Sequence, residues 1–486
     1  MTADSSTSCC TVPAADESSE IDASCRAPLF VLFLGAAVWL IVASVLGLIA
    51  SIKFHSPNFL ADCSCLTYGR VHPAAVNALL YGFAVPAGLG VMLWILARLG
   101  RTPLAHPLLM AVGAKFWNLG VLLGVLGILR GAGTGFENLE MPRYGARVLF
   151  IGFLLVAVLA VLTLHRRSER KLHPSQWFIL AALLWFPWIY STANLLLFKF
   201  QVRGVTQNVI AWWYSANLQI VWFGLVGVAA VFYFVPKLLN RPLHSGYTAL
   251  FTFWTLMLFG SWSGIPASAP VPAWMPALSA VAAVLMIVPV LSVITNLGCT
   301  IGGECAPLKS HVAGSFIRFA LPAFFFAALM NAASVLPGVS AITNFTWFTV
   351  AQSQLQTYGF FAMIMFGAVY YIVPRVTGVE WPCAKFVRAH FWLAAIGILL
   401  LVIPLAIGGV MQGLKLNNPQ IAFVDLAKTT LPFLRASTTG ELFIALGHIV
   451  FFLNLAGLAV ACFKKHCPLC RCGNAPAQAA IAEVKP

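Results

Sequence analysis

Charged residues are scarce in this chain of 486 residues. They make up 9% of the sequence and hydrophobic residues make up 60%, whereas soluble domains are about half apolar and about a quarter charged. This composition excludes a soluble globular protein. Apolar runs of about 20 residues, long enough to cross a bilayer as helices, recur along nearly the whole chain. The sequence therefore predicts an all-α integral membrane protein.

The apolar runs predict twelve membrane-spanning helices within one membrane domain at residues 27–464. The expected spans are 28–53, 72–97, 107–130, 146–164, 174–199, 207–236, 246–265, 275–298, 312–336, 345–374, 389–413 and 438–463. The segments 1–26 and 465–486 contain no such run. We expect both to be disordered tails.

Acidic residues are the rarer charged class, with 14 Asp and Glu against 29 Lys and Arg. Each acidic residue falls in a tail, in a predicted loop or, for Glu441, near the end of a predicted span. Carboxylates inside membranes usually serve ion or proton pathways. Their absence from the predicted spans argues against a proton pump or a cation-coupled transporter, and leaves open a channel or carrier for a neutral solute.

Basic residues give the chain a formal net charge of +15. In membrane proteins Lys and Arg gather in cytoplasmic loops. When the N-terminus is assigned to the cytoplasm, the basic run 165–171 and the pair Lys464 and Lys465 fall on that side, and the opposite side holds fewer cations. Topology therefore accounts for the charge without a nucleic-acid partner. Twelve spans place both termini in the cytoplasm.

Four sequence stretches resemble one known family. They are YGRVHPAAVNAL (68–79), WWY (212–214) followed by YFVPK (233–237), YYIVPRVTG (370–378) and RAHFWLAAIGILLLVIPLAIGGVMQGL (388–414). Together they resemble subunit I of the cbb3-type cytochrome c oxidases, within the heme-copper oxidase superfamily. The resemblance implies a twelve-helix bundle of the heme-copper oxidase subunit I type, in the respiratory chain of a bacterial inner membrane. It also implies electron transport, surrounding lipid and a membrane-bound cytochrome c subunit as a partner.

In that family six histidines hold two hemes and a copper ion, and none of the six matching positions is a histidine here. Those positions are Ala75, Ala216, Pro266, Ala267, Gln352 and Gln354, and the family's active-site tyrosine position is Gly260. Imidazole suits both iron and copper, whereas an amide oxygen is a weak ligand for heme iron. The resemblance therefore predicts a pseudoenzyme that does not reduce oxygen, although the family itself is enzymatic.

We expect no cofactor in the core, with heme b and copper present only if the family activity is retained. The first hypothesis is a structural, assembly or regulatory role in a respiratory membrane complex. The alternative is a heme-binding electron-transfer subunit whose ligands have moved to His72 or His448. We expect large side chains such as Trp262, Tyr358, Phe360 and Phe361 to fill the vacated space, with a lipid or quinone as the other occupant.

The run HCPLCRC near the C-terminus forms a second candidate site. It supplies His466, Cys467, Cys470 and Cys472, enough thiolate and imidazole ligands for tetrahedral zinc or for Cu(I). The predicted topology places this tail in the reducing cytoplasm, where thiols persist. The other reading is a set of reduced or palmitoylated thiols beside the membrane.

Overall fold

The computed structural model describes residues 14–303, 306, 308 and 311–466, and every regular element in these ranges is a helix. The elements of the first half are α1 (Ala14–His55), η1 (Ser64–Leu66), α2 (Tyr68–Asn77), η2 (Ala78–Ala84), α3 (Val85–Gly100), α4 (Pro107–Leu129), α5 (Arg143–His165), α6 (Pro174–Asn194), η3 (Leu195–Lys199), α7 (Val205–Ala216), η4 (Asn217–Trp222) and α8 (Phe223–Leu239). The second half contains α9 (Gly246–Trp262), α10 (Trp274–Leu285), α11 (Ile287–Ile301), α13 (Val312–Ser334), α14 (Pro337–Thr343), α15 (Trp347–Gln354), η5 (Leu355–Ala362), α16 (Met363–Thr377), α17 (Ala384–Leu416) and α18 (Phe423–His466).

Several short elements join end to end into single long helices. Among the described residues, 11 continuous helices are long and apolar enough to cross a membrane. Three of them are α2–η2–α3, α7–η4–α8 and α15–η5–α16, which lie in the centre of the bundle and are buried over 89 to 100% of their most apolar window. The all-helical membrane fold expected from the sequence is confirmed.

The expected span at 246–265 corresponds to α9, which has only 17 residues. At about 1.5 Å per residue such a helix is roughly 25 Å long, shorter than a hydrocarbon core of about 30 Å. The outward side of α9 is apolar, since Tyr247, Trp254 and Leu258 are largely exposed. The count of twelve crossings stays a prediction.

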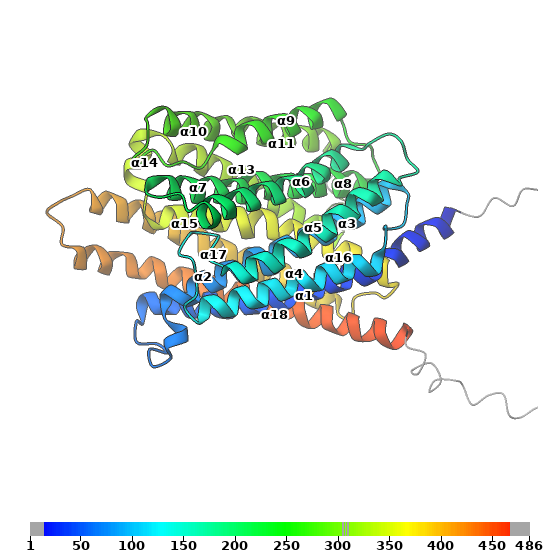
Figure 1. Ribbon diagram of the computed structural model, residues 1–486, viewed down its shortest axis with the longest axis horizontal. Coiled ribbons are helices and arrows are strands. Elements are labelled where there is room, and N and C mark those ends of the chain that lie inside the picture. The colour runs from blue at the N-terminus through cyan, green and yellow to red at the C-terminus, as the bar shows by residue number, and fades with distance from the viewer. Residues whose placement is uncertain (1–13, 304–305, 307, 309–310, 467–486) are drawn as a thin grey trace, which may run out of the picture.

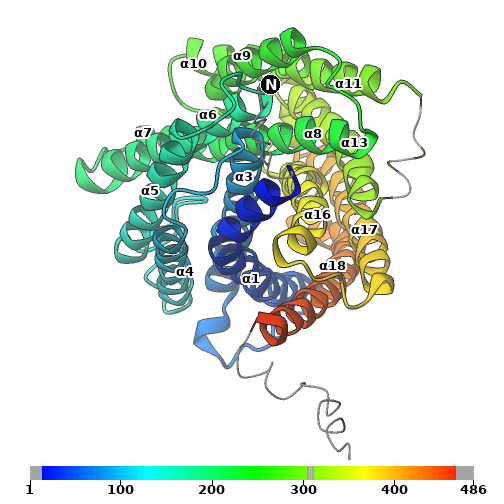
Figure 2. The same ribbon diagram turned by 90° about the vertical axis from the view of Figure 1, so that its right-hand side faces the viewer.

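The helices run side by side along the long axis of the molecule (Figure 1). The start of α1 and the end of α18 lie at the same end of the bundle. The loop after α1 and the turn between α17 and α18 lie at the opposite end (Figure 1). Seen along the bundle, α1, α16, α17 and α18 are neighbours, and α4 with α5 and α9 with α10 lie at the periphery (Figure 2).

The expected disordered tail at 1–26 is partly ordered. Helix α1 begins at Ala14, and its first turns pack against α3. Asp22 accepts a hydrogen bond from the Trp94 indole at 3.0 Å and pairs with Arg98 at 3.5 Å. Sequence reading could not detect these partners, because more than 70 residues separate them from Asp22. Residues 1–13 lie outside the described part of the chain.

Candidate functional site

Within the described residues, three of the four π-helical segments begin within three residues after a predicted ligand position. Segment η2 begins three residues after Ala75, η4 begins just after Ala216, and η5 begins just after Gln354. A π turn inserts an extra residue into the helical ladder and is frequent at functional sites. The backbone therefore has a local irregularity beside each of these positions, although the side chains there are Ala, Ala and Gln.

A cavity lies between α1, α2, α15, α17 and α18. Ala75, Gln354 and His72 all line it, together with Tyr358 of η5. Its volume is about 80 Å³, whereas pockets for sizeable ligands have about 300 to 1,000 Å³. The predicted heme-ligand positions Ala75 and Gln354 are thus brought to one shared space. That space accommodates a few water molecules and is too small for a heme.

His72 is the one histidine among the residues that line this cavity. Its ring stacks on Tyr68, with the ring centroids 5.3 Å apart and the planes inclined by 11°. Because His72 precedes Ala75 by less than one turn on α2, it reaches the same cavity, as the sequence suggested. His72 is therefore a group that could approach a ligand there.

The second candidate, His448, lies behind the cavity wall, where it contacts the lining residues Ser44 and Tyr358. It does not line the cavity, and its Nδ1 lies 2.7 Å from the hydroxyl oxygen of Ser44. Its ring centroid lies 6.3 Å from that of His390, whose Nδ1 contacts the Tyr370 hydroxyl at 3.0 Å. Both histidines are buried. They are arranged as a helix-contact cluster, and the structure does not bring His448 together with His72.

Gln352, the other predicted heme position on α15, contacts α13. Its amide nitrogen donates to the side-chain oxygen of Asn331 at 2.9 Å, and Ser334 donates to its amide oxygen at 3.5 Å. The neighbouring Ser353 donates to Gln219 at 3.0 Å. Both ends of the Gln352 amide therefore serve in holding α15 against α13.

Ala216, Pro266 and Ala267 match the family's copper-ligand positions, and the last two lie beyond the end of α9. This helix ends at Trp262, so Pro266 and Ala267 lie in the loop that follows. Gly264 has a φ of +109°, and a side chain there would collide with the methyl group of Ala216. The loop thus packs directly on Ala216. A side chain added at Gly260 would meet the Val221 side chain at 2.7 Å, so the predicted tyrosine position is also closed.

Aromatic rings fill the neighbouring interior. Phe360 stacks on Phe324 with centroids 4.1 Å apart, and Phe361 stacks on Phe223 at 4.2 Å. Both are fully buried, as expected from the sequence. The expectation for Trp262 is wrong: it is 55% exposed at the end of α9, because the helix turns this position outward.

The motif residues around Ala216 have structural roles. The Tyr214 hydroxyl lies 2.7 Å from that of Tyr81, and Ser215 accepts a hydrogen bond from Asn138 at 2.8 Å. Asn217 accepts a hydrogen bond from Trp185 at 3.2 Å. These contacts connect η4 and α7 to η2, to α6 and to the loop before α5.

That loop carries an enclosed carboxyl group outside the membrane-spanning segments. Glu140 accepts a hydrogen bond from the Asn77 amide at 2.7 Å. Burial raises the pKa of Glu140 to about 7, with the Asn77 hydrogen bond acting in the opposite direction. Glu140 therefore titrates near neutrality, a property that a loop position in the sequence does not reveal.

Glu441 is more enclosed than its predicted position near the end of a span suggested. Helix α18 begins at Phe423, 15 residues before the predicted span, so Glu441 lies well inside it. Its Oε2 atom is buried, and the side chain lines the cavity. This enclosed carboxyl group therefore weakens the argument against a cation-coupled function.

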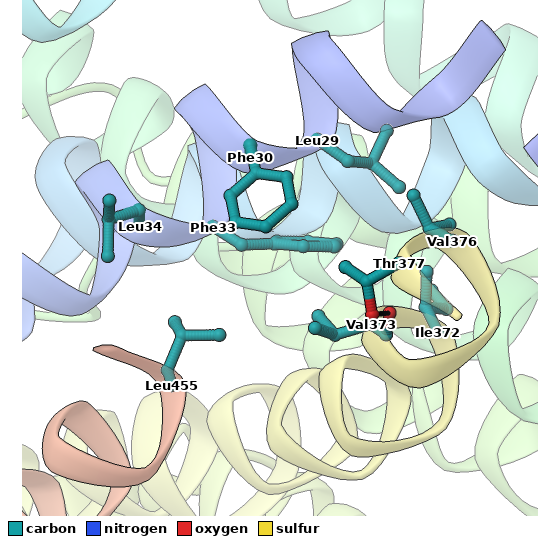
Figure 3. Close-up of a pocket in the computed structure, with 9 residues that line it drawn as sticks. All are labelled: Leu29, Phe30, Phe33, Leu34, Ile372, Val373, Val376, Thr377 and Leu455. Carbon is teal, nitrogen blue, oxygen red and sulfur yellow. Dashed lines mark hydrogen bonds between the residues drawn. The ribbon is translucent and has the colours of Figure 1, made fainter. Parts of the chain in front are cut away.

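A second cavity carries no polar chemistry. It has a volume of about 20 Å³ and lies between α1, α16 and α18, lined by residues such as Phe33, Val376 and Leu455 (Figure 3). Its one hydroxyl, on Thr377, donates to the Val373 carbonyl at 2.8 Å. This space offers apolar contact only.

The C-terminal candidate site lies almost wholly outside the described residues. Cys467, Cys470 and Cys472 are not described, and His466 is the last residue of α18. Within the described ranges no group of three or more His, Cys, Asp or Glu side chains could hold a metal ion. Metal binding at the tail stays a prediction.

The fold is that of a known class of membrane protein. The chain matches a solved heme-copper terminal oxidase, determined as a dimer, with a TM-score of 0.72 over 90% of this chain and 84% of that one, at 13% sequence identity. It thus has the heme-copper oxidase subunit I fold.

Sequence comparisons define the family. The model of the family "Cytochrome C and Quinol oxidase polypeptide I" matches residues 28–443, so the chain belongs to this family. It is 26% identical to the cbb3-type cytochrome c oxidase subunit CcoN1 of Stutzerimonas stutzeri over 437 residues, which are 87% of this chain and 91% of that protein. It is 22% identical to a cytochrome c oxidase subunit 1 homolog of Azorhizobium caulinodans, over 88% of this chain and 81% of that protein.

The residues of this chain do not fit the metal groups that the family name implies. At the six predicted ligand positions the side chains are methyl groups, a proline ring and two amides. One of these amides, on Gln352, is hydrogen-bonded to α13. The cavity that Ala75 and Gln354 share holds about 80 Å³. No step of oxygen chemistry can be derived from this arrangement.

Proposed function

We propose that the chain is a non-catalytic cbb3-type oxidase subunit I-like protein with a structural, assembly or regulatory role in a respiratory membrane complex. The observation that supports this most directly is the end of α9 at Trp262, which leaves Pro266 and Ala267 in a loop without imidazole. Reduction of oxygen depends on metal centres, which side chains alone do not replace. The family fold is kept, so its packing surfaces are available to partner subunits.

The proposal includes a location and a class of partner. The protein would lie in a bacterial inner membrane with both tails in the cytoplasm, and a membrane-bound cytochrome c subunit would be its neighbour. Two relatives are named as subunits of a cytochrome c oxidase or as homologs of one. The proposed tail site would bind zinc or Cu(I) through Cys467, Cys470, Cys472 and His466.

The test of this role compares membranes from a strain that lacks the chain with membranes from the same strain carrying it. We expect the purified chain to contribute no oxygen uptake of its own when reduced cytochrome c is supplied. Native gels should show less of an assembled respiratory complex when the chain is missing. Cyanide-sensitive oxygen uptake by the purified chain alone would overturn the proposal.

A second candidate is heme binding through moved ligands, favoured by the position of His72 beside Ala75 and Gln354 in one cavity. This reading requires the cavity to widen around the porphyrin. It predicts that His72→Ala removes a heme absorption band that His448→Ala retains, because His448 does not line that cavity. An absorption spectrum without heme bands in the unmodified protein rejects this candidate.

A further inference from the structure

Glu441 is the one charged side chain among the residues that line the cavity between α1, α2, α15, α17 and α18. Its Oε2 atom is buried and has no hydrogen-bond partner among the described residues. Among the described residues, no Lys or Arg lines the cavity. Ser51 is a hydrogen-bond partner of this carboxylate, but one enclosed oxygen remains without a partner, which is costly. Ionisable groups kept inside membrane proteins usually serve a function.

A second unpartnered acceptor lies in the same space. The Oε1 atom of Gln354 on α15 is also buried and has no hydrogen-bond partner among the described residues. Gln354 and Glu441 come from different helices, and both line the cavity. Each of these two oxygens is therefore open to a donor or a cation that enters the cavity.

The remaining polar groups of the lining add oxygen atoms. The Ser51 hydroxyl lies 2.7 Å from that of Thr438, and the Ser44 hydroxyl donates to the Leu40 carbonyl at 2.8 Å. Carboxylate, amide and hydroxyl oxygens are ligands for hard cations. The volume of about 80 Å³ accommodates a small ion with a few waters.

We propose that this cavity binds a small monovalent cation, held by the Glu441 carboxylate and the Gln354 amide oxygen, with water completing its coordination. One positive charge matches the single negative charge of the lining. The inference goes beyond the proposed function, since it assigns a ligand to the space whether or not the chain has an assembly role. The competing state is a Glu441 carboxyl that stays protonated and binds no ion.

The experiment is direct binding of ²²Na⁺ and ⁸⁶Rb⁺ to the purified full-length chain in detergent. The two isotopes cover the smaller and the larger alkali ions. We expect saturable binding of one ion per chain for at least one isotope. Glu441→Gln should lower the affinity by more than about tenfold, and Gln354→Leu should weaken it as well.

Two further variants separate binding from folding. A side chain added at Gly47 would meet no atom within 4 Å, and Gly47 lines the cavity. Gly47→Leu therefore fills the space without removing a ligand, and should also abolish binding. Glu380→Gln changes an exposed loop carboxylate and should leave binding unchanged.

Two results would overturn the proposal. One is the absence of saturable binding of either isotope to the unmodified chain, which is also the result expected for a protonated Glu441. The other is binding that persists in both Glu441→Gln and Gly47→Leu. The role in a respiratory complex is measured separately on native gels, so failure of the cation site leaves that test intact.

Discussion

At the scale of single residues, the two glutamines at predicted ligand positions make different contacts. Gln352 bonds to Asn331 at 2.9 Å and joins two helices, whereas Gln354 presents an unpartnered oxygen to a cavity. Side chains two positions apart on a helix point about 200° away from each other. The same spacing that would let two histidines face two hemes here lets two glutamines face a helix and a cavity.

Glu140 provides a residue-scale prediction about pH. Its pKa is raised to about 7 by burial, above the ordinary value of about 4.3 for the unfolded chain. The folded protein therefore binds the proton more tightly. The stabilisation this gives is fully present below about pH 4.5 and is lost as the pH rises through about 7.

Replacing this carboxyl group with an amide should remove the loss of stability at higher pH. Glu140→Gln retains an oxygen that can accept from Asn77, and we expect it to unfold at a higher temperature than the unmodified chain at pH 8. The gain should be of order 1 to 3 kcal/mol, with little difference near pH 4.5. Thermal unfolding in detergent at both pH values measures it, with Glu380→Gln as the control. Equal midpoints at pH 8 would contradict the assignment.

The sequence shows the residue types at the site but not their depth. Glu441 lies at the start of the most apolar part of its helix, so it reads as an interfacial residue. The preceding segment from Phe423 is also helical and packs beside α17, which buries Glu441. Glu441 is buried because a less apolar segment packs against α17, and a hydropathy profile does not report such packing.

At the scale of elements, α17 and α18 meet through small residues. A methyl group added at Gly440 would lie 2.5 Å from the backbone nitrogen of Leu401, and one at Gly397 would lie 2.9 Å from the carbonyl oxygen of Gly440. Small residues let helices in membranes approach closely, which strengthens van der Waals packing. This contact places Glu441 and the cavity wall.

Gly440→Ala should therefore destabilise the protein. The added methyl group would meet backbone rather than a movable side chain, and we expect a loss of about 1 to 3 kcal/mol. Gly298→Ala is the matched control, because a side chain there meets nothing within 4 Å and alanine favours a helix. Unfolding midpoints of both variants in one detergent test this. Similar midpoints would refute the close contact.

Most helices could be predicted from the sequence, and the exception is instructive. The run 246–265 is as apolar as its neighbours, yet α9 ends at Trp262. Gly264 adopts a positive φ of +109° and Pro266 follows two residues later, a combination that stops a helix. Apolar composition is read over a long window, and a helix end is set by one or two residues.

At the scale of the whole molecule, the outer ends of α1 and α18 indicate the topology. The start of α1 and the end of α18 lie at one end of the bundle (Figure 1). This arrangement requires an even number of crossings. Because the described residues contain 11 other helices long enough to cross, α9 would have to cross as well, despite its 17 residues. A short span can be accommodated by local thinning of the bilayer.

Reporter fusions at the two termini test this arrangement. We expect a fluorescent protein that folds only in the cytoplasm to be bright at either end, and alkaline phosphatase to be inactive at both. Fusions within the loop after α1 should give the opposite pattern. A bright N-terminal fusion with a dark C-terminal one would mean that α9 does not cross.

The central claim is that this chain keeps the fold of the oxidase subunit I family without its redox metals. The most direct measurement is a pyridine-hemochrome spectrum of the purified protein, with copper determined on the same sample. We expect heme and copper far below one per chain. Stoichiometric b-type heme, with or without copper, would contradict it and would make His72 the first residue to replace.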